Sequence, residues 1–157
     1  MKVDHINAFY VAIQEIFKLM LDLDVEKGEL RIVEDMVSSK DANVLLGITG
    51  DLKGSILFGF PKHMALEMVN IMSGVDMDEI DTFVSSALGE VVNIIGGNAL
   101  TSLSNYDYIC NMAPPQIIVG KYKSISMASE RSLLIPLETE IGKFDVNVFL
   151  AEAKNIN

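Results

Sequence analysis

The sequence predicts an α+β fold in which helices pack on one largely antiparallel, six-stranded sheet. The first observation is the order of the periodic segments: one helix, three strands, two helices and three strands. Strands that come in runs, and do not alternate with helices, favour an antiparallel sheet over a series of β-α-β units. The second observation is composition, because 157 residues, half of them apolar, fit a single domain (1–157) with a sizeable core.

The first half of the chain predicts one helix followed by three strands. Apolar residues recur at spacings of three and four over 3–22, which is the period of a helix, and Asp4 is placed to cap it. Strand-like segments then follow at 29–38, 43–49 and 55–60. The last two are separated by a glycine-flanked stretch, which is typical of a hairpin turn.

Two helices are predicted next. A short helix is expected over 62–72, and its methionine stripe is interpreted as core filling: Met64, Met68 and Met72. A long helix is expected over 77–103, with Asp76 and Glu79 in a capping arrangement at its start. The acidic residues near that start are interpreted as solvated carboxylates that favour the helix dipole, and not as a cation site.

The last three predicted strands lie at 116–122, 132–138 and 144–151. Pro136 lies inside the second of them, which suggests a sheet edge or a bulge at that point. The third becomes fully apolar at its end and contains no proline or lysine, so we expect it to be an open edge that pairs with a second copy in a two-fold dimer. The alternative is that 144–151 is a central strand within one monomer.

Charge and residue usage exclude several classes of function. The net charge is −10, from 12 basic and 22 acidic residues, so we expect neither nucleic acid nor an anionic membrane as a partner. Two histidines and one cysteine give no metal-ligand spacing, and we expect no metal or cofactor of the chain's own. The N-terminus does not resemble a signal peptide, so a cytoplasmic location is expected.

The long helix has two distinct faces at about 100° per residue. The core face contains Val84, Leu88, Val92, Ile95, Ala99 and Leu103. The polar stripe contains Glu79, Ser86, Glu90, Asn93, Gly97 and Thr101, interrupted by Phe83. Asn93 is a poor helix former, and Gly96 and Gly97 each cost about 1 kcal/mol relative to alanine, which suggests an approaching partner backbone. From the residues alone, an ordinary solvated face remains an open interpretation for Glu90 and Asn93.

A wider pattern surrounds these two residues. Ser86, Glu90 and Asn93 are followed by Gly97 and then by Pro114-Pro115, and the segment 47–55 has a glycine-rich hairpin pattern. This combination resembles the CheC/CheX/FliY phosphatases over nearly the whole chain. A single Glu-x-x-Asn helix is similar to CheX, since CheC typically carries two. Leu100 departs from the pattern, because a basic residue is frequent there in the family.

The resemblance implies a phosphatase that acts on the aspartyl phosphate of a CheY-like chemotaxis response regulator. It implies that Asn93 orients the attacking water and that Glu90 pairs with a lysine of the regulator. Ser86 and Gly97 are expected to contact the regulator, which would bring its own Mg²⁺. It also implies a homodimer. The alternative function is a module of the CheX type that binds receiver domains of a two-component pathway without hydrolysis.

Overall fold

The computed structural model describes residues 3–37, 40–120 and 125–153. Its helices are α1 (Val3–Leu21), α2 (Lys62–Ser73) and α3 (Thr82–Ser104). Its strands are β1 (Glu26–Lys27), β2 (Arg31–Val37), β3 (Ala42–Gly50), β4 (Leu52–Phe60), β5 (Cys110–Met112), β6 (Gln116–Val119), β7 (Ile125–Thr139) and β8 (Gly142–Glu152). The ends of two predicted strands, at Ser38 and at 121–122, lie outside the described residues.

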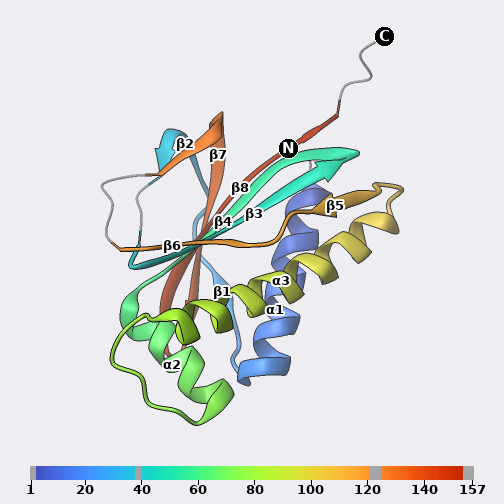
Figure 1. Cartoon of the computed structure of the whole chain (residues 1–157). Helices are drawn as coiled ribbons and strands as arrows, with labels where there is room; N and C mark the ends of the chain where they lie inside the picture. The colour runs from blue at the N-terminus through green and yellow to red at the C-terminus, as the bar shows by residue number, and fades with distance from the viewer. Residues whose placement is uncertain (1–2, 38–39, 121–124, 154–157) are drawn as a thin grey trace.

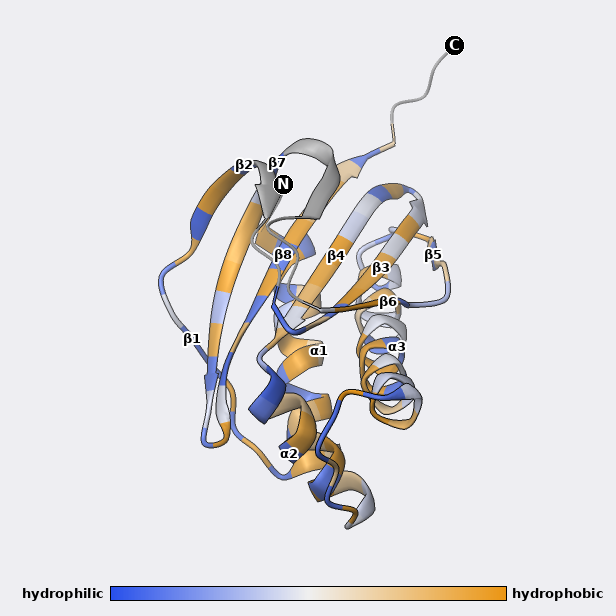
Figure 2. Ribbon diagram, turned by 60° about the vertical axis from the view of Figure 1, so that its left-hand side comes forward, coloured by the Kyte–Doolittle hydropathy of each residue, from blue (hydrophilic) through white to orange (hydrophobic). Residues whose placement is uncertain are grey.

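The strands form one curved, antiparallel sheet in the order β1-β7-β8-β4-β3-β5, with β2 also paired to β7 and β6 to β3. The three helices lie together on one side of this sheet (Figures 1 and 2). The predicted α+β class and antiparallel sheet are therefore confirmed. The described chain has eight strands where six were predicted, because β1 and β5 have only two and three residues and are too short to show a period.

The core lies between the helices and the inner face of the sheet. Phe144 of β8 stacks between Phe17 of α1 and Phe60 of β4, with ring centroids 5.0 and 5.1 Å apart. Alternate residues of β3 also point inward and are fully buried: Val44, Leu46 and Ile48. Met64 and Met68 of α2 are buried too, which confirms that the methionine stripe fills the core.

The expected open edge at 144–151 is wrong. β8 pairs with β4 on one side and with β7 on the other, so it is a central strand with no free edge. Phe149, on the face away from the helices, packs against Leu57 of β4, which explains the apolar run at the end of this strand. An apolar segment buried on both faces is typical of a central strand. The predicted two-fold dimer was to form by pairing of this edge, so the strand cannot form it in that way.

At Pro136 a sheet edge is wrong, because β7 lies inside the sheet, but the other alternative, a local irregularity, is present: the three residues 28–30 lie opposite the two residues 135–136. The carbonyl of Pro136 accepts a hydrogen bond from the Gly28 N–H at 2.8 Å. In an antiparallel strand the N–H and C=O of one residue point to the same side, so the missing donor of Pro136 faces residues 28–30, where β1 ends and before β2 begins. The strand pairing that proline cannot complete is therefore interrupted between β1 and β2, and β7 itself continues through Pro136.

The start of α3 differs from the prediction as well. Asp81 is the N-cap, and its side chain accepts a hydrogen bond from the Val84 N–H at 2.9 Å. Asp76 instead accepts a hydrogen bond from the Asn70 side chain at 2.6 Å, and Glu79 forms an ion pair with Lys62 at 3.2 Å. Both predicted capping residues thus hold the connection between α2 and α3, and the helix begins five residues later than expected.

Candidate functional site

The position of α3 in the core determines which of its residues face outward. All six residues of the predicted core face are fully buried: Val84, Leu88, Val92, Ile95, Ala99 and Leu103. Within the described ranges, α3 is also the one helix long and apolar enough to cross a membrane by length and composition. Its apolar side packs against the sheet and α1, which is the arrangement of a core helix.

The polar stripe lies on the outer side of α3, as the periodicity predicts. Glu90 and Ser86 are exposed, and Asn93 and Gly97 are half-buried. Glu90 and Asn93 are three residues apart on a helix, so their Cβ atoms are about 5–6 Å from each other. In the described part of the chain, neither side chain makes a hydrogen bond or an ion pair. Both polar groups are therefore available to a partner.

The adjacent glycines of α3 have different surroundings, which the sequence does not reveal. A Cβ on Gly96 would lie 2.7 Å from Cδ2 of Leu46 and 2.7 Å from Sδ of Met112. A Cβ on Gly97 would meet no atom within 4 Å. The prediction that both glycines leave room for the backbone of a partner protein is wrong for Gly96, which leaves room for side chains of β3 and β5 instead. For Gly97 it remains a prediction.

The edge segment that contains β5 and β6 runs alongside the same part of α3. Met112 lies against Gly96, and Ile117 lies against Gly89, where a Cβ would be 3.1 Å from Cδ1 of the isoleucine. The intervening residues 113–116, which include Pro114-Pro115, therefore run antiparallel to the turn of α3 that carries Glu90 and Asn93. Figure 1 shows this segment running alongside α3. The two prolines thus border the polar stripe, although they are distant in sequence.

A groove of about 740 Å³ lies elsewhere, at the end of α1 and the β7–β8 turn. Its lining is mostly acidic: Asp22, Asp24, Glu26, Glu138 and Glu140. A hydrogen bond to Asp22 raises the pKa of Lys18, and one to Glu138 raises the pKa of Lys143. The groove is mostly lined by negatively charged side chains, so it repels phosphate groups.

The residues described include no group of three His, Cys, Asp or Glu that could hold a metal ion.

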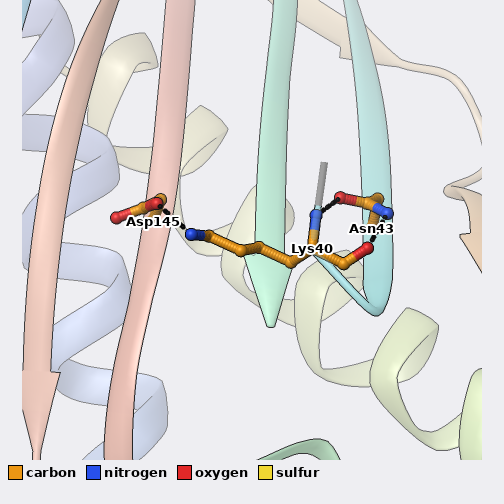
Figure 3. Close-up of polar contacts among 3 residues, drawn as sticks. All are labelled: Lys40, Asn43 and Asp145. Carbon is orange, nitrogen blue, oxygen red and sulfur yellow. Dashed lines mark hydrogen bonds and ion pairs between the residues drawn. The ribbon is translucent and has the colours of Figure 1, made fainter. Parts of the chain in front are cut away.

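A second polar cluster lies on the face of the sheet away from the helices (Figure 3). The side chain of Asn43, 1% exposed, accepts a hydrogen bond from the Lys40 N–H at 2.9 Å and donates to the Lys40 and Ile118 carbonyls at 2.8 and 3.1 Å. The Lys40 ammonium reaches Asp145 of β8 at 3.3 Å, and its stem passes over Gly59, where a Cβ would be 2.8 Å away. Because each partner here is internal, this cluster fixes strand positions.

Within the described residues, Glu90 and Asn93 lack internal partners, whereas two other members of the polar stripe have them: Glu79 pairs with Lys62, and Thr101 donates to the Gly97 carbonyl. A carboxamide can donate and accept hydrogen bonds at once, so Asn93 can hold a water molecule in a defined orientation. The Glu90 carboxylate can accept hydrogen bonds from a cationic group. Both project from the outer face of a helix, an arrangement that suits insertion into the cavity of another macromolecule.

The chain is similar to several known proteins. A family model described as chemotaxis phosphatase CheX matches residues 42–138, which include all of α3 and the β5–β6 segment. The CheY-P phosphatase CheX of Thermotoga maritima is 25% identical over 117 residues, covering 74% of this chain and 76% of that protein.

Two solved structures share the fold at similar identity. A CheC-like superfamily protein from Shewanella sp. PV-4 superposes with a TM-score of 0.88 at 28% identity, covering 96% of this chain and 99% of that one. The CheX–CheY–BeF₃–Mg²⁺ complex of Borrelia burgdorferi superposes with a TM-score of 0.80 at 26% identity, covering 96% and 100%.

Proposed function

The chain belongs to the chemotaxis phosphatase CheX family, and we propose that it hydrolyses the aspartyl phosphate of a CheY-like response regulator. The observation that carries this proposal is the pair Glu90 and Asn93, which project from α3 without internal partners among the residues described. Support also comes from the similar Thermotoga maritima protein, a CheY-P phosphatase, and from the similar Borrelia burgdorferi structure, a complex with CheY.

In this proposal Asn93 enters the active site of the regulator and orients a water molecule toward phosphorus. The water oxygen forms the new P–O bond, and the bond between phosphorus and the aspartyl oxygen breaks. The products are the free aspartate carboxylate and inorganic phosphate. Phosphoryl transfer passes through a loose transition state, so positioning supplies most of the catalytic gain. A neutral carboxamide suits this task because it does not repel the phosphoryl oxygens.

Glu90 has the docking role in the same proposal. Its carboxylate pairs with the lysine of the regulator that contacts the phosphoryl group, and this contact places Asn93 beside the phosphorus. The regulator contributes Mg²⁺ and its own acidic residues. This division of labour gives Asn93 and Glu90 separate tests, since loss of Asn93 affects the chemical step and loss of Glu90 affects binding.

The neighbouring residues of the stripe complete the proposed contact surface. Ser86 is exposed one turn before Glu90, and Gly97 lies one turn after Asn93, so both flank the proposed active pair. The reaction would take place in the cytoplasm, with the phosphorylated receiver domain. A two-fold dimer rests on the family resemblance alone, and light scattering tests it: a mass near 17 kDa would exclude the dimer.

The experiment that tests the proposed function mixes a small amount of the protein with an excess of phosphorylated receiver domain. We expect phosphate release to exceed the spontaneous rate and to continue for many turnovers. The alternative, a binding module without hydrolysis, predicts a stable complex with no acceleration. No complex and no acceleration, with several receiver domains from the same genome, would contradict both.

A further inference from the structure

Phe83 is an exposed aromatic residue on the same line of α3 as the proposed docking residues. Its side chain is 47% exposed. Seven residues, or about two turns, separate it from Glu90, and another seven separate Glu90 from Gly97. At about 100° per residue, a step of seven returns to within about 20° of the same direction. Phe83 therefore points to the same side of the molecule as Glu90 and Gly97.

The packing of the domain gives no internal reason for phenylalanine at this position. The hydrophobic core and the smaller cluster on the outer face of the sheet do not include Phe83 among the described residues. It makes none of the aromatic contacts found within the chain. The helix cap next to it is formed by Asp81, which accepts a hydrogen bond from the Val84 N–H, and does not depend on the ring.

The distance from the proposed catalytic pair puts Phe83 within reach of the same partner. It lies about 13 Å along the helix from the midpoint of Glu90 and Asn93, at about 1.5 Å per residue. A standard protein interface covers about 800 Å² on each partner, which corresponds to a disc of radius about 16 Å. An interface centred on Glu90 and Asn93 therefore includes Phe83. Ser104, the last residue of α3, is about 19 Å from that midpoint, so Tyr106 in the following turn falls outside this interface.

We propose that Phe83 is an affinity-determining residue that packs into an apolar depression on the receiver domain, about 13 Å from the point that Glu90 and Asn93 would contact. This inference rests on the proposed function, because it uses the same partner and docking direction. Aromatic side chains are enriched in protein interfaces relative to the rest of the surface, and a few interface residues supply most of the binding energy. The two residues before Phe83 in the chain, Asp81 and Thr82, are polar and exposed and would form part of the rim.

The test measures binding and hydrolysis separately for Phe83→Ala, Phe83→Leu and Tyr106→Ala. The probe is a CheY-like receiver domain, activated with beryllofluoride and Mg²⁺ for binding and phosphorylated for kinetics. We expect Phe83→Ala to weaken binding and to raise KM about tenfold, with kcat unchanged, since it removes contact in both ground and transition states. Phe83→Leu should restore most of the affinity. Tyr106→Ala, which truncates an aromatic side chain of comparable exposure (57%), should match the unmodified protein.

The outcomes separate this inference from the proposed function. If the unmodified protein binds and dephosphorylates the receiver but Phe83→Ala binds within about twofold of it, Phe83 is not an anchor and the proposed function stands. An equal loss in Tyr106→Ala would also overturn the inference, because the effect would not be local to Phe83. If the unmodified protein neither binds nor dephosphorylates any receiver, the proposed function fails and this inference falls with it.

Discussion

Gly96 and Gly97 are neighbours in α3, yet a methyl group on the first would overlap Leu46 and Met112 at 2.7 Å while one on the second would meet nothing within 4 Å. The first glycine is therefore required by the packing of the helix on the sheet. The second costs helix stability without an internal benefit, since glycine in a helix interior is about 1 kcal/mol less favourable than alanine. This contrast allows docking and folding to be tested with two adjacent substitutions.

Gly97→Ala is expected to raise the free energy of unfolding by up to about 1 kcal/mol, because alanine is the better helix former and has space for its methyl group. If a partner backbone approaches here, the same variant should bind the activated receiver domain more weakly. Denaturant unfolding and a binding titration give the two values. Stabilisation with unchanged affinity would remove Gly97 from the docking surface.

Gly96→Ala is the matched control, with the same chemical change one residue earlier. Overpacking costs about 1–3 kcal/mol, so this variant should be less stable than Gly97→Ala by about that amount. Denaturant unfolding of the two variants measures the difference directly. Equal stability would mean that Leu46 and Met112 move aside without cost.

Asn43→Ala should destabilise the fold by about 1–3 kcal/mol, because it leaves the Lys40 N–H and the Lys40 and Ile118 carbonyls without the partner that Asn43 provides. Lys40→Met is the control within the same cluster. It removes the ion pair to Asp145, whose side chain is 30% exposed, and should cost less than about 1 kcal/mol. The free energy of unfolding of each variant is the measurement, and a larger loss for Lys40→Met would reverse this account of the cluster.

Glu90→Ala is expected to weaken receiver binding, since truncating one partner of a buried interfacial charge pair costs about 2–5 kcal/mol. Glu90→Lys should bind still more weakly, because it places like charge opposite the lysine of the regulator. The side chain is exposed in the free protein, so neither change should shift the melting temperature by more than a few degrees. Unchanged affinity in both variants would exclude Glu90 from the docking contact.

Much of the architecture could be predicted from the sequence because its elements have clear periods. The core face of α3 and the inward residues of β3 follow from spacing alone, and the same spacing places Glu90 and Asn93 on the outer side. The roles proposed for this pair come from a family resemblance, since a Glu-x-x-Asn spacing is compatible with an ordinary solvated surface. Geometry could locate the site but could not supply its chemistry.

The errors arose where tertiary contacts decide between local alternatives. The sequence predicts Asp76 as the cap of α3, but Asp76 accepts a hydrogen bond from the Asn70 side chain, and Asp81 caps the helix instead. The apolar end of β8 fits either an open edge or a strand buried on both faces, and only its two neighbours in the sheet distinguish them. Likewise, the different surroundings of Gly96 and Gly97 depend on side chains that are distant in sequence.

The most direct test of the central claim is the rate of phosphate release from a phosphorylated CheY-like receiver domain, compared between the unmodified protein and Asn93→Ala at saturating concentration. Binding to the beryllofluoride-activated receiver is measured alongside, and circular dichroism confirms that the variant is folded. If Asn93 orients the attacking water, Asn93→Ala binds the receiver and releases phosphate no faster than the receiver does alone. A variant that binds and still dephosphorylates at the rate of the unmodified protein would contradict the account.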